Sequence, residues 1–529
     1  MSYLFHARAG LIPSCVAAAS VLLLTALPAS AQTDAACSAL LSYAPAGLKL
    51  KITAAAHATD RKTQSGQFGP GVTLPPHCHV EGELDRRTGS DGKSYALRFA
   101  VNLPDKWNGR YLFQGGGGLN GNLGVPLGGQ ATGSQNALTR GFAVVSTDSG
   151  HQGQGGGFDA SFMADQEAAL NFYFLGNMRV TEATKPLVQQ YYSAAINKSY
   201  FVGCSTGGRE GMIMAQRYPF LYDGIVTGSP AIRTGLSNLG LRWINVQMNQ
   251  AAAKDAKGQP VPEGTYSKDE QKLIVNSLVQ ACDALDGAKD GLIFNVAACK
   301  FDPHTIACKA GQKGDSCLAP AKADALAKAM AGPVDSRGVQ VYSRFPYDTG
   351  IADPGFIPGI LNGGKPPVGA PSAAMMKQDV DAEFIANTAA DTAIGDSVSL
   401  KLSSFAAHGG KQIFYHGMSD PWFSAIDTLT YYENMTAANG GLQAVDKFSR
   451  IFMVPGMGHC QGGSATLDTF DMLTPIVEWV ENDKAPASVA ATGKSMPGVS
   501  RPLCPYPQHA QYKGTGDINA VENFSCKGP

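Results

Sequence analysis

Short apolar runs alternate with amphipathic helical patterns in the two outer parts of the chain. The apolar runs predict strands at residues 94–103, 110–114, 143–146, 200–203, 224–230, 411–415 and 450–454. The helical patterns predict helices at 165–192, with a break near Pro186, after Gly208, after Ser424 and at 466–482. Strands separated by helices in this way predict a parallel sheet covered by helices on both faces.

This rhythm changes between residues 231 and 406. The stretch contains four cysteines, a proline-rich run at 353–371, and helical patterns at 267–284 and 321–331. A chain of 529 residues suits two or three domains of roughly 100 to 200 residues each. We therefore interpret residues 231–406 as a lid domain inserted into a discontinuous sheet domain, residues 32–230 and 407–529.

The balance of charges argues against two classes of partner. The formal net charge is −1, from 42 basic and 43 acidic residues, without a long run of like charge. Nucleic acids and anionic membranes are bound through basic patches, so we expect neither as a partner. The 62 glycines and 31 prolines indicate long loops and tight turns, which favours an enzyme over a helical bundle. The sequence does not indicate an oligomeric state.

The N-terminus has the features of an export signal. An apolar stretch at 11–27 is followed by Ala29-Ser30-Ala31, a small-residue cleavage site, which predicts a signal peptide at residues 1–31. The mature protein would then be periplasmic or extracellular. A lipoprotein signal with Cys15 as the lipidated residue is the alternative, which a neighbouring proline and the better downstream site disfavour. No other stretch is long and apolar enough to span a bilayer.

The segment Gly203-Cys204-Ser205-Thr206-Gly207 joins the predicted strand at 200–203 to the helix after Gly208. It fits the nucleophile elbow Gly-x-Ser-x-Gly, in which a sharp strand-to-helix turn lifts the serine hydroxyl clear of the backbone. Such a turn aims the N–H of Thr206 at a developing oxyanion. A glycine-rich turn with a solvated serine is the alternative, because so short a pattern also occurs by chance.

The elbow serine needs a base and an orienting acid, which in this type of site follow in the order serine, acid, histidine. His459 lies in a glycine-lined loop after the strand at 450–454. Asp420 lies just past the strand at 411–415, and Asp427 is the fallback acid. A surface-loop histidine and an Asp-Pro turn are the alternatives for the two main candidates.

The cysteines connect the serine to the histidine. Of the 11 cysteines, one lies in the predicted signal peptide, and an even number in an exported chain predicts disulfides without giving their connectivity. Cys204 directly precedes Ser205, and Cys460 directly follows His459. A bond between these cysteines would fix their Cα atoms about 5.5 Å apart and hold the serine near the histidine. Two unrelated disulfides are the alternative, which leaves the coincidence of positions unexplained.

These features resemble the tannase and feruloyl esterase family, whose hallmark is a Cys-Ser, Asp, His-Cys set with the two cysteines bonded. The resemblance covers nearly the whole mature chain, including the motifs at 203–209, 146–151, 228–231 and 501–506. It implies an α/β fold with an α/β-hydrolase-type doubly wound sheet and a large inserted lid domain.

The resemblance also implies roles for individual residues. Ser205 would be the nucleophile, His459 the general base and then acid, and Asp420 the carboxylate that orients His459. The glycine run 115–118 would form the oxyanion loop. The implied donors to the oxyanion are the N–H groups of Thr206, Gly117 and Gly118, and the sequence does not decide which glycine donates. The implied disulfides are Cys37–Cys78, Cys204–Cys460, Cys282–Cys299, Cys308–Cys317 and Cys504–Cys526.

The predicted lid carries an acidic loop between Cys282 and Leu292. Three carboxylates in a glycine-bearing loop offer the hard oxygen ligands that Ca²⁺ prefers. The spacing is not that of an EF-hand, so from the residues alone a solvated acidic loop fits equally well. The resemblance implies a structural Ca²⁺ ion bound by Asp283, Asp286 and Asp290 together with the carbonyls of Ala288 and Leu292.

The substrate is the least defined part of the prediction. Members of this family hydrolyse esters of gallate, of hydroxycinnamates such as ferulate, and of terephthalate with ethylene glycol. Phe423 would lie near the acyl site and could stack on an aromatic acid, with ordinary packing as the alternative. No arginine occurs between Arg344 and Arg450, which weakens the case for a guanidinium clamp on a terephthalate carboxylate, although Arg344 or Lys377 would remain.

The sequence therefore predicts a secreted serine carboxylic-ester hydrolase that acts on a small ester of an aromatic acid, of the feruloyl or galloyl type. A mono(2-hydroxyethyl) terephthalate hydrolase-like esterase is the alternative. A calcium-dependent binding module without turnover is a third hypothesis, and the intact set of Ser205, Asp420 and His459 argues against it.

Overall fold

The computed structural model describes residues 34–59, 72–153, 157–256, 258, 260, 264–312, 316–355, 357–362 and 376–528. The predicted signal peptide at residues 1–31 lies outside these ranges. Within them, no helix combines the length and the apolar character that crossing a membrane requires.

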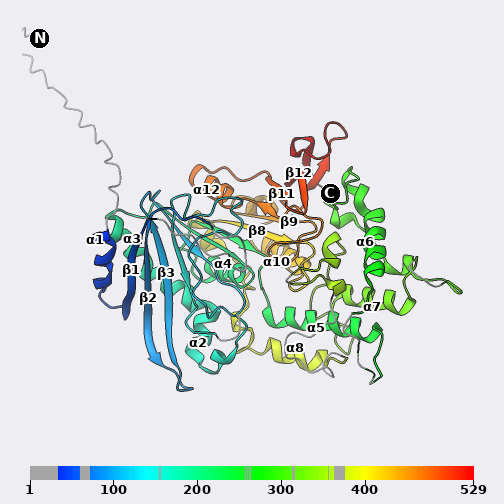
Figure 1. The fold of residues 1–529 in the computed structure, drawn as a ribbon, viewed down its shortest axis with the longest axis horizontal. Helices are drawn as coiled ribbons and strands as arrows, with labels where there is room; N and C mark the ends of the chain where they lie inside the picture. Colours follow the sequence, from blue (N-terminus) through cyan, green and yellow to red (C-terminus); the bar gives the residue numbers. More distant parts are fainter. Residues whose placement is uncertain are drawn as a thin grey trace, which may run out of the picture.

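A nine-stranded sheet runs through the molecule in the order β1-β2-β3-β5-β4-β6-β7-β8-β9. Its edge strand β1 lies at the left of Figure 1, and β8 and β9 lie near the middle. Strands β1, β2, β3 and β5 pair antiparallel. The remaining neighbours in the sheet order, from β5 through β4, β6, β7 and β8 to β9, pair parallel. The apolar pattern did not predict β1 and β2, because alanine-rich and charged segments have weak strand propensity. The strands are β1 (Leu50–Ala58), β2 (His77–Thr88), β3 (Ser94–Pro104), β4 (Arg110–Gln114), β5 (Ala143–Thr147), β6 (Lys198–Cys204), β7 (Gly224–Gly228), β8 (Lys411–Gly417), β9 (Ser449–Val454), β10 (Thr469–Phe470), β11 (Val489–Gly493), β12 (Met496–Leu503), β13 (His509–Tyr512) and β14 (Phe524–Lys527).

Two helices differ from the predicted pattern. The expected break near Pro186 is absent from a helix that spans Gly176–Tyr192, because burial of its apolar side outweighs the one backbone hydrogen bond that proline removes. The helix predicted at 466–482 begins only at Leu473, where the Asp471 carboxylate accepts hydrogen bonds from the first N–H groups. The helices are α1 (Asp34–Ala39), α2 (Gln166–Leu170), α3 (Gly176–Tyr192), α4 (Thr206–Arg217), α5 (Thr234–Ala251), α6 (Lys268–Cys282), α7 (Pro320–Ala331), α8 (Val380–Thr388), α9 (Ser403–Ala407), α10 (Ala425–Ala438), α11 (Leu442–Val445) and α12 (Leu473–Asn482).

Each face of the sheet has its own core. Phe113 and Phe201 pack on one face with residues of α3, α4 and α10. Their sequence neighbours Leu112 and Tyr200 pack on the other face with residues of α12, because successive side chains of a strand point in opposite directions. Because helices cover both faces of the sheet, we expect the functional site at the carboxyl ends of the parallel strands.

The chain leaves the sheet after β7 and returns at β8, and these two strands are direct parallel neighbours. The residues between them form helices α5 to α9, of which α5 to α8 lie together on the side of the molecule away from β1 (Figure 1). The inserted segment has a hydrophobic core of its own, which includes Leu239, Met248, Ile274, Leu326 and Phe345.

Five disulfides join the ten cysteines of the described residues. They match the pairing that the family resemblance implied: Cys37–Cys78, Cys204–Cys460, Cys282–Cys299, Cys308–Cys317 and Cys504–Cys526.

Candidate active site

Ser205 lies at a sharp turn between strand β6 and helix α4. Its φ of 63° is in the left-handed region, which is uncommon for a residue with a side chain. The Ser205 N–H donates to the Gly228 carbonyl at 3.0 Å. A Cβ atom at Gly203 would lie 2.3 Å from the Gly207 carbonyl oxygen, so the close crossing of strand and helix requires glycine at position 203. This is the geometry of a nucleophile elbow.

Asp420 and His459 are hydrogen-bonded at the ends of β8 and β9. Asp420 Oδ2 lies 2.7 Å from His459 Nδ1, and the other carboxylate oxygen accepts the N–H groups of Trp422 at 2.9 Å and Phe423 at 3.1 Å. Burial alone would raise the pKa of the Asp420 carboxyl. The charge of His459 and the hydrogen bonds from His416 and His459 outweigh burial and hold this pKa well below its usual range. Asp420 therefore stays ionised beside the histidine.

A second histidine, His416, contacts the same carboxylate. Its Nε2 lies 3.3 Å from Asp420 Oδ2 and 2.9 Å from the Phe423 carbonyl oxygen. Both oxygens are acceptors, so Nε2 donates, while Nδ1 lies 2.9 Å from the Thr428 hydroxyl. Sequence reasoning counted His416 among the downstream histidines without giving it a role, because its contact with Asp420 arises only from the bend at the end of β8.

The Cys204–Cys460 disulfide brings the elbow and the histidine loop together. The two Cα atoms are 6.0 Å apart, and His459 Nε2 lies 3.8 Å from Cys460 Sγ. Among the hydrogen bonds of the described residues, none joins Ser205 Oγ to His459. Catalytic hydrogen bonds are often long without substrate and shorten when it binds. The covalent link between the neighbouring cysteines nevertheless limits how far Ser205 and His459 can separate.

The glycine run predicted to form the oxyanion loop packs against the start of helix α4. The Gly116 N–H donates to Glu210 Oε2 at 2.9 Å, and Asn120 Nδ2 donates to Glu210 Oε1 at 2.8 Å. The His151 ring supports the same loop from outside, with Nε2 2.8 Å from the Leu119 carbonyl oxygen. Glu210 and His151 are anchors that the sequence pattern did not reveal.

The hydrogen bonding of this loop narrows the choice of oxyanion donor. The Gly115 N–H is bonded to the Val202 carbonyl, and that of Gly116 is taken by the buried glutamate. In the described part of the chain, no hydrogen bond engages the N–H groups of Gly117 and Gly118. Thr206 opens helix α4, so its N–H has no partner within the helix. Its hydroxyl donates to the Gly118 carbonyl at 2.5 Å and ties the loop to the elbow.

Three aromatic rings, Phe158, Trp422 and Phe423, form an aromatic wall beside His459. The Phe423 centroid lies 5.0 Å from that of His459 with the planes at 61°. Trp422 stacks on Phe423 at 5.4 Å and 16°, and Phe158 stacks on Trp422 at 5.9 Å and 25°. Phe423 is buried whereas Phe158 is 52% exposed, so the wall leads from the histidine to the surface. The sequence predicted only Phe423.

The fallback acid Asp427 does not reach the histidine. Its carboxylate is paired with Arg233 and accepts the Ser343 hydroxyl at 2.9 Å. Of the two candidate acids, Asp420 is therefore the one that contacts His459. The pairing also offsets the charge of the Arg233 guanidinium through its Nε and Nη2 atoms.

The acidic loop of the inserted segment is folded around its own N–H groups. The carboxylates of Asp283 and Asp286 each accept two of them, at 2.8 to 3.2 Å, and Asp290 is paired with Arg501. Burial, together with the charges of the other two aspartates, raises the pKa of Asp286 to about 6. Across the described residues, no three acidic, histidine or cysteine side chains meet as a group that could hold a metal ion.

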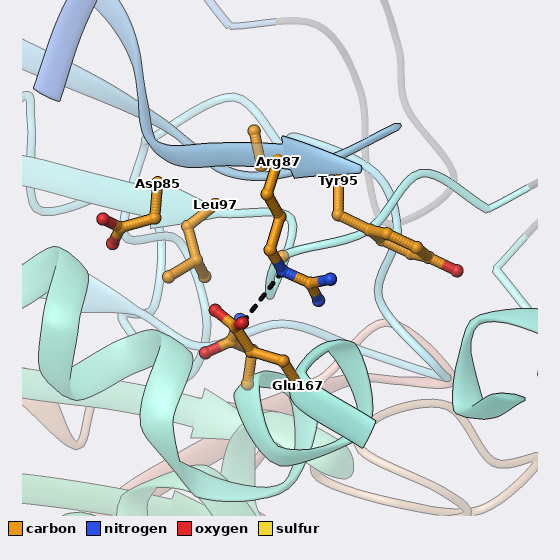
Figure 2. A pocket seen from close by; sticks show the side chains of 8 residues that line it. Asp85, Arg87, Tyr95, Leu97 and Glu167 are labelled. Carbon is orange, nitrogen blue, oxygen red and sulfur yellow. Dashed lines mark ion pairs between the residues drawn. The ribbon is translucent and has the colours of Figure 1, made fainter. Parts of the chain in front are cut away.

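Figure 2 shows a pocket that is lined by a different set of residues. Its lining includes Asp85, Arg87, Tyr95, Leu97 and Glu167. Arg87 and Glu167 are ion-paired at 3.0 Å. Because none of the triad, elbow or oxyanion-loop residues lines this pocket, it plays no part in the site.

Comparisons with known proteins agree with this geometry. The sequence matches the family described as "Tannase and feruloyl esterase" over residues 78–395 and 373–527. Mono(2-hydroxyethyl) terephthalate hydrolase of Piscinibacter sakaiensis is 38% identical over 522 residues, 87% of this chain and 86% of that protein. A probable feruloyl esterase of Arthroderma benhamiae is 28% identical over 506 residues, 88% of this chain and 89% of that protein.

The solved structure of feruloyl esterase B from Aspergillus oryzae superposes with a TM-score of 0.76 at 24% identity. The match covers 93% of this chain and 100% of that one, which confirms the α/β-hydrolase-type fold. The chain therefore belongs to the tannase and feruloyl esterase family and is a carboxylic ester hydrolase.

Proposed function

We propose that the protein hydrolyses esters of aromatic carboxylic acids through a triad of Ser205, His459 and Asp420. The observation that carries the proposal is the 2.7 Å hydrogen bond between Asp420 and His459, formed beside a serine that a disulfide holds in place. A serine elbow, a histidine and a buried ionised acid in this relation are the parts of an acyl-transfer site.

The chemistry follows from the geometry of these groups. His459 Nε2 accepts the Ser205 hydroxyl proton as Oγ forms a bond to the ester carbonyl carbon, and Asp420 stabilises the resulting imidazolium. The oxyanion accepts hydrogen bonds from Thr206 N–H and from Gly117 or Gly118. His459 then returns the proton to the departing alcohol, which leaves an acyl-serine.

The second half of the reaction regenerates the enzyme. A water molecule gives a proton to His459 and attacks the acyl carbon, and the proton then passes to Ser205 Oγ as the carboxylic acid leaves. Glu210 and His151 hold the oxyanion loop in place through both halves. Preorganised donors of this kind are each worth about 3 to 4 kcal/mol to the transition state.

The aromatic wall supports an aromatic acid as the substrate. Flat rings stack on aromatic side chains at distances like those within the wall, and Phe423 is already in contact with His459. A tannase or feruloyl esterase substrate, with its gallate or ferulate ring, fits this chemistry. The names of the relatives point to the same class of acid.

A terephthalate monoester is the second candidate substrate. The relative that is 38% identical is named for hydrolysis of mono(2-hydroxyethyl) terephthalate, which supports it. Against it, the stretch between Arg344 and Arg450 contains no arginine to bind the second carboxylate, and Arg233 is paired with Asp427. A free carboxylate on the acid would therefore find no guanidinium in the stretch between these two arginines, which leaves Arg344 or Lys377 as its partner.

Turnover of matched esters tests both candidates. We expect the oxidatively folded protein to show a higher kcat/KM on methyl ferulate or methyl gallate than on an aliphatic butyrate ester or on the terephthalate monoester. Ser205→Ala should abolish turnover with little change in Tm, and Trp422→Ala should lower kcat/KM for the aromatic esters more than for the butyrate. Equal turnover of the butyrate would overturn the substrate class, and an active Ser205→Ala variant would overturn the mechanism.

We propose in addition that the acidic loop binds a structural Ca²⁺ ion. Asp283, Asp286 and Asp290 carry hard oxygen donors within one short loop, but their side chains do not converge in the structure. They would have to turn toward a bound ion, and the carbonyls of Ala288 and Leu292 would complete the set. The loop carries three carboxylates and Lys289, and Arg501 pairs with Asp290, so one net negative charge remains that a cation would offset. The ion would hold the loop against the C-terminal strands and take no part in the reaction.

We further propose that the protein is exported, with residues 1–31 removed. Five disulfides in the mature chain are what an oxidising compartment allows. N-terminal sequencing of the protein purified from its host should begin at Gln32. A mature protein that retains the N-terminal segment would contradict this.

A further inference from the structure

Asp348 connects the inserted segment to both loops of the triad. It precedes the short 3₁₀ helix Thr349–Ala352 and is fully buried. A single oxygen, Asp348 Oδ2, accepts the Ser419 hydroxyl at 2.9 Å and the Gly456 N–H at 2.5 Å. Ser419 is the residue before Asp420, and Gly456 lies in the loop that carries His459. One oxygen of the inserted segment thus bridges the acid loop and the histidine loop.

The packing around this bridge leaves little room for adjustment. The Gly350 N–H donates to the Ser419 hydroxyl oxygen at 2.9 Å. A Cβ atom at Gly350 would lie 2.4 Å from the Gly456 carbonyl oxygen and 2.6 Å from Ser419 Cβ. The two loops also contact each other directly, through Ser419 N–H and the Met457 carbonyl at 2.9 Å. The turn at Asp348 is therefore packed closely against both loops.

The chemistry at this position is unusual for a purely structural contact. The second carboxylate oxygen, Oδ1, is buried and has no hydrogen-bond partner among the described residues. Burial raises the pKa of the Asp348 carboxyl to about 6, and the hydrogen bonds from Gly456 and Ser419 only partly oppose it. A buried carboxylate without a cation costs stability. The carboxylate oxygen Oδ2 nevertheless accepts a hydrogen bond from each of the two loops.

We propose that Asp348 is a positioning residue, which sets the spacing between Asp420 and His459 when the inserted segment is docked on the sheet domain. The hydrogen bonds of the triad then depend on a residue far from them in sequence, so docking of the segment and assembly of the site are coupled. For its kinetic readout this inference rests on the proposed esterase function.

Three variants and a matched control test the proposal on the full disulfide-bonded protein. Asp348→Ala removes the bridge, Ser419→Ala removes one of its two arms, and Asp348→Asn keeps an acceptor oxygen for both donors. Asp335→Ala is the control, because Asp335 is a buried aspartate of the same segment that bonds within its own turn, to Arg337 and Val339.

The expected result is a loss of kcat without a matching change in KM. A misplacement of about 1 Å at a reacting group costs about 100-fold. We expect kcat to fall about 10- to 100-fold in Asp348→Ala and less in Ser419→Ala, with KM within about threefold of wild type. Asp348→Asn should recover most of the activity, and Asp335→Ala should lower Tm without lowering kcat.

A spectroscopic readout separates this inference from the esterase proposal. The proton between His459 and Asp420 gives a downfield ¹H NMR resonance, which should be lost in Asp348→Ala and kept in Asp335→Ala. If the wild type hydrolyses no ester, this resonance still decides the role of Asp348. The proposal is overturned if Ser419→Ala and folded Asp348→Ala keep wild-type kcat, or if they keep the resonance unchanged.

Discussion

His416 Nε2 lies 3.3 Å from Asp420 Oδ2, the same oxygen that binds His459. The proposed acid of the triad is thus held by two imidazoles on one oxygen and by two backbone N–H groups on the other. The side chains of His416 and Asp420 are both fully buried. This contact fixes the rotamer of the carboxylate before substrate arrives.

Replacing His416 should weaken catalysis through Asp420. In His416→Ala one hydrogen bond to a buried charged group is lost, which costs about 1 to 3 kcal/mol. Because the same carboxylate stabilises the imidazolium of His459 in the transition state, we expect kcat to fall about 10- to 100-fold. His416→Gln, whose amide can donate from a similar place, should lose less. Steady-state kinetics on the preferred ester and thermal melts of both variants check this. A His416→Ala enzyme with wild-type kcat would show that the contact does not serve the triad.

Removing the Cys204–Cys460 disulfide should reduce both stability and activity. The bond closes a sequence separation of 256 residues, which in the chain-entropy model corresponds to about 5 kcal/mol of stabilisation. It also keeps the serine turn beside the histidine loop, so a Cys204→Ala/Cys460→Ala double variant should lose most of its kcat as well.

The matched control is the Cys308–Cys317 disulfide. It spans only 9 residues in the inserted segment, so its removal should cost about 3 kcal/mol at most and leave kcat unchanged. Denaturant melts give the loss of unfolding free energy in each double variant, and steady-state kinetics give the change in kcat. Equal effects on kcat would mean that the bond beside the triad acts only through global stability.

The sequence predicted the parts of the site that local chemistry dictates. The elbow at Ser205 could be predicted because its glycines are required by backbone contact, and Cys204 and Cys460 point to the histidine loop by adjacency. His416 and Asp348 could not be predicted in the same way. Their roles come from contacts across a strand end and across the boundary of the inserted segment, which no periodicity in the chain encodes.

Part of the fold escaped prediction for a similar reason. Strand β1 is rich in alanine and only Ile52 and Ala58 of its residues are buried, so its pairing with β2, rather than its own composition, makes it a strand. Helix α3 continues through Pro186 because the sheet beneath it supplies the burial that offsets the lost hydrogen bond. In both cases tertiary contact overrides local propensity.

Removal of Ca²⁺ should lower thermal stability before it lowers activity. The proposed ligands lie in a loop held to the C-terminal strands, through Asp290 with Arg501 and through the Asp286 carbonyl with Gln511. Chelation should therefore lower Tm by several degrees and leave kcat at 25 °C unchanged. Differential scanning fluorimetry with and without a chelator checks this, and Asp283→Asn should be insensitive to the chelator. Loss of turnover in a chelated protein that is still folded would make the structural role wrong.

The buried carboxyl of Asp348 should make stability depend on pH in a way that Asp348→Asn does not. Its pKa is raised from 3.8 to about 6 in the folded protein, so folding favours the protonated form. The contribution to stability is complete below about pH 4 and is lost as pH rises through about 6. A shift of this size corresponds to about 3 kcal/mol.

The comparison of wild type and Asp348→Asn isolates this effect, because all other titrating groups are common to both proteins. Urea melts at pH 4, 5, 6 and 7 should show the variant gaining up to about 3 kcal/mol relative to wild type between the lowest and the highest pH. The gain should end above pH 7, where the carboxylate is fully ionised in wild type. A difference that stays constant across this range would show that Asp348 carries the same charge in the folded and unfolded protein, and that its buried oxygen has a compensating partner.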